Sequence, residues 1–179
     1  MRIAPAEQQR ARRAPRAVPV IVFSVGLEYF AIEAAAIREI GSTDGLAGAA
    51  SAFAHPEVPK VRHTLQRGAR SYYVVSACAY FRMPTSRPSL ILLLNDSRTA
   101  VLVDHVERMS EITGRLELPH AFSGEERSWY RGLAILNDRV VPVVNPASFL
   151  TRHEITALDA ATGAANSENS SRLQGAVRA

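Results

Sequence analysis

The sequence is poor in cysteine: of its 179 residues, only Cys78 carries a thiol. One thiol cannot form an internal disulfide, and it cannot supply a zinc site that needs several thiolates. Cys78 lies in the apolar run YYVVSACAYF, so we interpret it as a small buried hydrophobic side chain. A chain of this length can bury a core without cross-links.

Long hydrophobic runs are also absent. A membrane-spanning helix needs about 20 apolar residues, whereas the candidates VPVIVFSV and LILLL are far shorter. The basic N-terminal segment is followed by an apolar stretch that ends at Gly26, without the small-residue cleavage pattern of a secretory signal. We therefore expect a cytoplasmic protein that does not insert into a membrane.

The sequence has no recognisable catalytic or cofactor motif. It contains neither G-x-x-x-x-G-K nor G-x-G-x-x-G, and H-E-x-x-H does not occur. Asp104 and His105 are adjacent, but neighbours on a strand point to opposite faces and cannot act as a base and its orienting group. We predict no catalytic residue, no metal site, no cofactor and no small-molecule substrate.

The net charge of +4 lies at the N-terminus. Residues 1–16 hold five arginines and Glu7, which already gives +4, so the remaining chain is nearly neutral. A neutral body argues against a dedicated nucleic-acid domain. We predict a disordered basic arm over residues 1–17 and a disordered polar tail over 163–179. The alternative for the arm is electrostatic binding to acidic lipid or nucleic acid.

Residues 18–162 have the pattern of a mostly β domain. Short β-branched and aromatic runs alternate with turn residues, which indicates a barrel or a sandwich. Strands are predicted at Val18–Val25, Tyr29–Ile32, Ser71–Phe81, Leu90–Leu94, Thr99–Val103, Glu107–Ile112, Tyr130–Leu136 and Val140–Val144.

Helices are predicted at two places. Residues 33–40 favour a short helical turn with Ile37 and Ile40 on one side, and residues 41–56 favour a loop. Thr151 and Glu154 have the spacing of a capping box, which predicts a helix over 151–161 that packs through Ile155 and Leu158.

Four segments, in this order, resemble the CheW-like family of chemotaxis coupling proteins. They are Phe23–Ile40, the Arg67-Gly68 turn preceded by Leu65, Ala100–Ile112, and Tyr130–Ala161 with its Gly-x-x-x-hydrophobic-x-Asp-Arg hairpin. The first half departs from the family pattern. Val61 or His63 stands where a glycine is usual, and Tyr73-Val74-Val75-Ser76 replaces Pro-x-hydrophobic-Asp.

The resemblance implies a fold and a function. The fold would be two small five-stranded SH3-like β-barrels packed together, with short helices and a C-terminal helix. The function would be non-catalytic: coupling the cytoplasmic tip of a chemoreceptor to the regulatory domain of a CheA-like histidine kinase. Recruitment to membrane-receptor arrays would then occur through these partners.

The resemblance also implies a set of partner-binding residues, with Arg67 on a turn beside Val106 and Met109. The set is Ile37, Glu39, Arg67, Gly68, Val106 and Met109. On composition alone, residues such as Ile37, Val106 and Met109 belong more often to a core than to an interface. Glu39 is most often a solvated charge, and Arg67 could be a solvated turn residue. Gly68 could serve only a positive φ.

Two other function classes stay open. One is an adaptor of the same fold for another output, such as surface motility. The other is a small β-barrel that binds nucleic acid through its basic arm.

Overall fold

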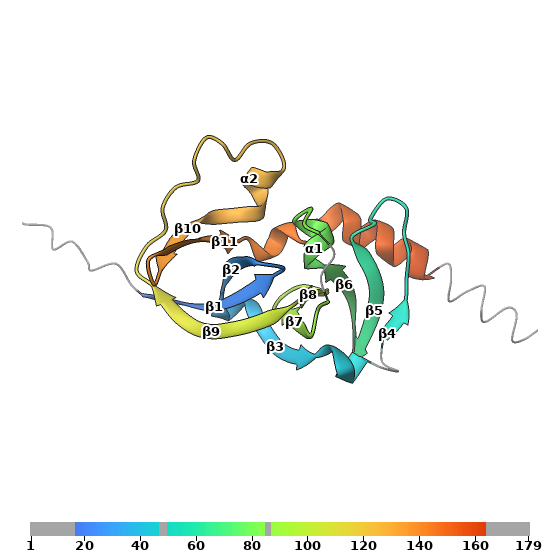
Figure 1. The fold of residues 1–179 in the computed structure, drawn as a ribbon. Helices are drawn as coiled ribbons and strands as arrows, with labels where there is room; N and C mark the ends of the chain where they lie inside the picture. The colour runs from blue at the N-terminus through green and yellow to red at the C-terminus, as the bar shows by residue number, and fades with distance from the viewer. Residues whose placement is uncertain (1–16, 47–49, 85–86, 164–179) are drawn as a thin grey trace, which may run out of the picture.

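The computed structural model describes residues 17–46, 50–84 and 87–163. In these ranges the chain forms two β-sheets with short helices at their margins (Figure 1). The predicted basic arm and polar tail lie outside the described residues, except for residues 17 and 163.

The first sheet has the strand order β10-β11-β2-β1-β9. Its strands come from both ends of the described chain. They are β1 (Val18–Val25), β2 (Glu28–Glu33), β9 (His105–Ile112), β10 (Tyr130–Leu136) and β11 (Arg139–Val144). Neighbours pair antiparallel, except for a short parallel contact of Val143 on β11 with Ala31 on β2.

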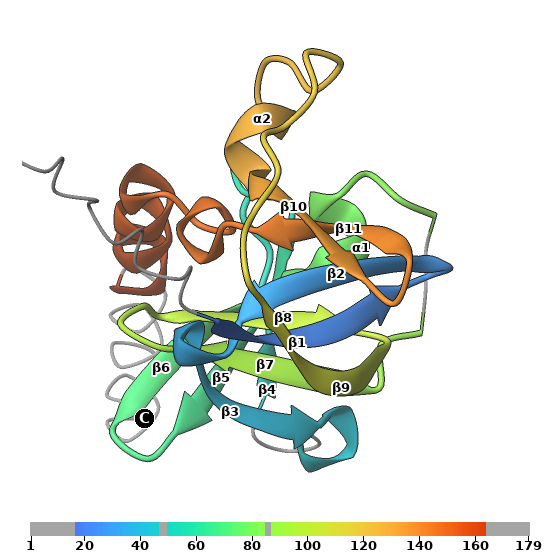
Figure 2. The ribbon, with the colours of Figure 1, turned by 90° about the vertical axis from the view of Figure 1, so that its left-hand side faces the viewer.

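The second sheet is built from one continuous stretch between β2 and β9, with the order β3-β7-β8-β6-β5-β4. Its strands are β3 (Ile37–Ser42), β4 (Ala50–Ala52), β5 (Val61–Arg67), β6 (Arg70–Ser76), β7 (Leu90–Leu94) and β8 (Thr99–Val103). Figure 2 shows the second sheet below the first. The chain leaves the first sheet to form β3 and returns to it to form β9.

Short helices connect the strands. They are the 3-10 turns η1 (Ala34–Ala36), η2 (Thr43–Leu46) and η3 (Pro146–Ser148), the helices α1 (Ala77–Tyr80) and α2 (Glu126–Trp129), and a longer helix over residues 152–163. This C-terminal helix follows β11 and η3, and packs Leu158 and Ile155 against the core, as predicted. Among the described residues, no helix is both long and apolar enough to cross a bilayer.

The alternation of side chains explains why the strands are apolar on both faces. On β1, Val20 and Val22 lie in a cluster inside the first sheet, whereas Ile21 and Phe23 lie in a larger cluster that includes residues of both sheets. We call the larger cluster the shared core. Because successive strand residues point to opposite faces, a strand between two cores needs a continuous apolar run.

The same alternation occurs in the second sheet. Ile91 and Leu93 of β7 face a cluster inside that sheet, and Leu92 and Leu94 face the shared core. The run LILLL is therefore a strand buried on both sides, not a shortened membrane segment.

The predicted capping box is present. The Thr151 amide donates to Glu154 Oε2 at 2.7 Å, and the Glu154 amide donates to Thr151 Oγ1 at 3.2 Å. These two bonds satisfy amides that a helix start leaves without partners. Glu154 Oε1 also accepts an ion pair from Lys60 at 2.7 Å, which fixes the helix start to the second sheet.

Several sequence predictions were wrong in detail. Residues 33–40 do not form one helical turn: η1 ends at Ala36, and Ile37 begins a strand that pairs with β7. The strand predicted to run to Phe81 ends at Ser76, where α1 begins. Cys78 on α1 is half-buried, with Sγ 3.0 Å from Ser76 Oγ. Strands β3, β4 and β5 were not predicted, and the second sheet has six strands.

Candidate partner-binding surface

The six predicted partner-binding residues are divided between the two sheets. Ile37 and Glu39 lie on β3, Arg67 ends β5, and Gly68 begins the turn to β6, all in the second sheet. Val106 and Met109 lie on β9, an end strand of the first sheet.

An ion pair joins two of the six residues. Arg67 Nη2 lies 3.4 Å from Glu39 Oε1, and the two side chains are 38% and 45% exposed. In the strand order, β3 and β5 are four positions apart. A flat sheet would separate them by roughly 19 Å. The ion pair therefore requires a strongly curled second sheet.

The Arg67 side chain is only partly satisfied by Glu39. Its Nε is buried and has no hydrogen-bond partner among the described residues. A Cβ added to Gly41 on β3 would lie 3.7 Å from Arg67 Nη2, so the guanidinium lies over a strand that offers it space. The partly exposed terminal nitrogens of the guanidinium can donate further hydrogen bonds to carboxylate or carbonyl oxygens.

The turn after Arg67 depends on Gly68. Its φ of +58° lies in the left-handed region, which favours glycine, and a Cβ there would meet no atom within 4 Å. Gln66 Nε2 donates to the Gly68 carbonyl at 2.7 Å. Backbone conformation is thus a sufficient reason for this glycine.

The apolar members of the set differ in exposure. Ile37 and Val106 are half-buried and pack against the shared core. Met109 is 69% exposed. The Arg67 guanidinium forms an ion pair with Glu39 in its own sheet. A position of Arg67 beside Val106 and Met109 stays a prediction.

An apolar surface on the first sheet was missed by sequence reasoning. Ile135 on β10 and Val140 on β11 are register partners, and both are 61% exposed. Beside them lies a groove of about 570 Å³, lined among others by Phe30, Phe81 and Tyr130. The sequence did hold a signal for this surface. Successive side chains on β10 and β11 alternate between two faces, and Ile135 and Val140 occupy the face opposite the buried Leu136 and Val141.

The groove is lined by aromatic side chains and by the charged Glu28 and Arg139. Burial, with a smaller contribution from the negative charge of Glu126, raises the pKa of Tyr130 to about 12. Its phenol is therefore protonated at neutral pH. Within the described ranges, no group of three His, Cys, Asp or Glu side chains is placed to hold a metal ion.

Two β-sheets that share one core, with a C-terminal helix across them, define a two-lobed β domain. The CheW-like domain model matches residues 19–154, which include strands of both sheets. The chain belongs to the CheW-like domain family, and the resemblance found in the sequence is confirmed.

A solved structure agrees with this assignment. The scaffolding protein TtCheW from Thermoanaerobacter tengcongensis is 16% identical to the chain, with a TM-score of 0.61, over 73% of this chain and 90% of that one. At this identity the similarity concerns the fold. No curated protein matches the chain.

Proposed function

We propose that the protein is a non-catalytic adaptor of chemotaxis-type signalling, which couples a chemoreceptor to a CheA-like histidine kinase. The observation that carries the proposal is the family match over residues 19–154, because it includes strands of both lobes and not one isolated motif. The partners would be the cytoplasmic tip of the receptor and the regulatory domain of the kinase.

Curling of the two sheets supports the barrel form that the family resemblance implies. The Glu39–Arg67 ion pair draws β3 towards β5 in the second sheet. In the first sheet, the end strands β9 and β10 also approach each other. We infer that each sheet is one barrel-like lobe, and that the partners dock on edges, turns and the exposed apolar surface of the first sheet.

The pKa shifts support a role without acid–base catalysis. Perturbed pKa values often mark catalytic groups. Here, burial is the main cause that raises the pKa of Tyr73, Tyr80 and Tyr130. For Glu154, burial alone would raise the pKa, but hydrogen bonds from Lys60 and Thr151 outweigh it and lower the pKa. Each of these groups serves packing or helix attachment.

Arg67 is the proposed anchor for the receptor. Its side chain is partly exposed, so the terminal guanidinium nitrogens can donate a charge-assisted hydrogen bond to a partner oxygen. We expect Arg67→Glu to weaken receptor-tip binding by about 2 kcal/mol, the scale of an interface hot spot. Kinase binding should survive if the kinase uses another face.

The experiment is a pair of titrations, with the receptor tip and the kinase regulatory domain, beside a melting curve. Arg70→Glu is the matched control, because Arg70 is the cross-strand partner of Arg67 on the other side of the same turn. Equal losses for both variants would indicate only general electrostatics. Unchanged affinity of Arg67→Glu for both partners would remove Arg67 from the site. Failure of the wild type to bind either partner would overturn the adaptor proposal itself.

A further inference from the structure

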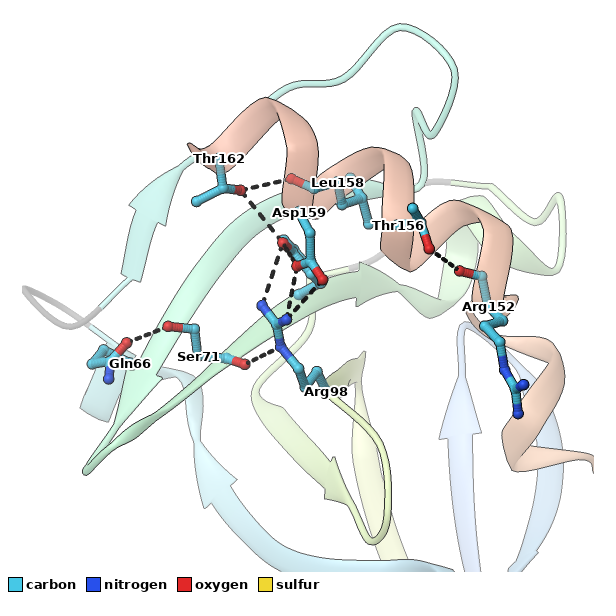
Figure 3. Close-up of polar contacts among 9 residues, drawn as sticks. Gln66, Ser71, Arg98, Arg152, Thr156, Leu158, Asp159 and Thr162 are labelled. Carbon is cyan, nitrogen blue, oxygen red and sulfur yellow. Dashed lines mark hydrogen bonds and ion pairs between the residues drawn. The ribbon is translucent and has the colours of Figure 1, made fainter. Parts of the chain in front are cut away.

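A series of polar contacts connects the C-terminal helix to the turn that carries Arg67 and Gly68, and Figure 3 shows it from Asp159 to Gln66. It begins at Asp159 on the helix over residues 152–163. Arg98 Nη1 lies 2.7 Å from Asp159 Oδ1 and 2.9 Å from Oδ2. The Tyr73 hydroxyl also donates to Oδ1, at 2.5 Å. The carboxylate is thus held by a cation and a phenol from the second sheet.

Arg98 is the second link, in the connection between β7 and β8. Its guanidinium lies 5.1 Å from the centre of the Tyr73 ring, and its Nε donates to the Ser71 carbonyl at 3.3 Å. Its own carbonyl accepts the Tyr73 amide at 2.8 Å. Arg98 therefore fixes the strand that leaves the turn, at a point two residues beyond Ala69.

Ser71 and Gln66 complete the chain. They face each other across the β5–β6 hairpin, next to the turn. The Ser71 hydroxyl donates to Gln66 Oε1 at 2.5 Å, and Gln66 Nε2 donates to the Gly68 carbonyl at 2.7 Å. Each contact between residues from Asp159 to Gly68 is thus a hydrogen bond or an ion pair. Within Ser71, the residue itself joins the carbonyl that Arg98 binds to the hydroxyl that binds Gln66.

The turn needs such support if Arg67 is to hold one position. The ion pair of Arg67 with Glu39 is long, at 3.4 Å, and partly exposed. Exposed pairs of this kind contribute little to order. The placement of the guanidinium therefore depends on the backbone of the turn, and the backbone depends on Gln66, Ser71 and Arg98.

We propose that Asp159 and Arg98 are positioning residues for the Arg67–Gly68 turn, so that attachment of the C-terminal helix sets the geometry of the partner-binding turn. The effect of Asp159 and Arg98 on the turn does not depend on what the protein binds. Only its effect on partner binding rests on the proposed adaptor function.

The first experiment measures amide hydrogen exchange at Gly68 and Ala69 in the full chain. Asp159→Asn removes the charge that holds Arg98, and we expect about three- to five-fold faster exchange in the turn. Glu154→Gln is the matched control. Glu154→Gln removes the ion pair between Glu154 of the same helix and Lys60. Lys60 adjoins the start of β5, whereas Arg67 lies at the opposite end of that strand.

Two further variants separate positioning from general helix docking. Asp159→Glu retains the charge and should restore most of the protection. Ser71→Ala removes only the hydroxyl link to Gln66, because Arg98 binds the Ser71 backbone carbonyl. We therefore expect faster exchange in the turn than in the wild type, and a further increase when Asp159→Asn is added. Unchanged exchange in Asp159→Asn overturns the proposal. So does equal acceleration by Asp159→Asn and Glu154→Gln.

The second experiment titrates the same variants with a receptor-tip fragment. We expect Asp159→Asn to weaken binding about three-fold, through the misplaced Arg67. If turn exchange rises and Arg67→Glu weakens binding but Asp159→Asn does not, the link between the helix and binding is wrong. If turn exchange rises and no variant, including Arg67→Glu, changes binding, the positioning role stands and the proposed function of Arg67 fails.

Discussion

The two sheets bury similar apolar strands but present different surfaces. Five of the six large hydrophobic side chains that are exposed in the described residues belong to the first sheet or its connections, namely Leu27, Met109, Leu116, Ile135 and Val140. The second sheet contributes only Ile40. Ion pairs occur at both sheets: Lys60–Glu154, Arg67–Glu39 and Arg98–Asp159 at the second, and Arg115 and Arg131 with Glu33 at the first. The second sheet thus presents polar contacts almost without an exposed apolar surface, whereas the first presents both.

The difference indicates two modes of contact in one small domain. An exposed apolar surface favours tight docking without strict orientation, whereas paired charges with directed hydrogen bonds favour a defined orientation. A scaffold that brings two partners together can use one mode for each. The shared core is what makes the two surfaces one rigid unit, so the sharpest tests begin there.

The largest expected effect comes from the shared core. Phe23 is fully buried and stacks on Phe30, with ring centres 5.7 Å apart. We expect Phe23→Ala to reduce the free energy of unfolding by about 3–5 kcal/mol, and both sheets to unfold in one urea transition. Val22→Ala, its neighbour in the first-sheet core, should cost less, about 1–2 kcal/mol. Two separate transitions would show that the sheets are independent units.

The second effect concerns the crossing between the sheets. Asp104 lies between β8 and β9, is buried, and accepts the Gly26 amide at 2.6 Å. Asp104→Ala leaves that amide without its acceptor and should cost about 1–3 kcal/mol in thermal or chemical denaturation. Glu107→Ala, on the exposed side of β9, is the control. An equal cost for the two would mean that the Gly26 contact has no special role.

A smaller effect, dependent on pH, is expected at the helix start. Folding lowers the pKa of Glu154 from its ordinary value of 4.5. The ionised carboxylate therefore stabilises the folded state fully above the ordinary pKa, and this stabilisation is lost as the pH falls through the lowered pKa. Glu154→Gln should cost about 1 kcal/mol at neutral pH. The difference from wild type should shrink below about pH 4. A cost that is constant from neutral to acid pH would contradict the assignment.

The smallest expected change in stability is on the exposed face of the first sheet. Met109→Ser should alter the free energy of unfolding by no more than about 0.5 kcal/mol, while weakening partner binding by about 1 kcal/mol. Leu27→Ser is the control, since Leu27 is 93% exposed in the turn between β1 and β2 of the first sheet but lies outside the proposed set. If Leu27→Ser weakens binding as much as Met109→Ser, the first sheet binds through general apolarity rather than through Met109.

Sequence patterns predicted the strands with a clear apolar run or alternation, and missed β3, β4 and β5, which have neither. The runs at Val18–Val25 and Leu90–Leu94 are continuously apolar, so they were recognised. Strand β5 reads VRHTLQR, which is mostly polar, and β3 follows an alanine-rich segment that favours a helix. Pairing with β7 overrides that local preference, as tertiary contacts often do.

The candidate site shows the same limit. Arg67 and Gly68 were singled out because, with Leu65 before them, they resemble the Leu-Arg-Gly turn of the family. The contact of Arg67 with Glu39 joins β3 and β5, four positions apart in the strand order, and it arises from the curling of the sheet. The chain from Asp159 to Gly68 likewise joins elements that no local spacing connects.

The chain order of the strands also has a consequence for synthesis on the ribosome. Hairpin β1–β2 emerges first, but its neighbours β9 and β11 follow only after the whole second sheet. The second sheet can fold as a contiguous segment, whereas the nascent hairpin must wait with Val20, Val22 and Ala31 uncovered. A waiting apolar hairpin is a natural target for chaperones and a hazard for aggregation. Slowing translation between β2 and β9 should therefore lower the soluble yield.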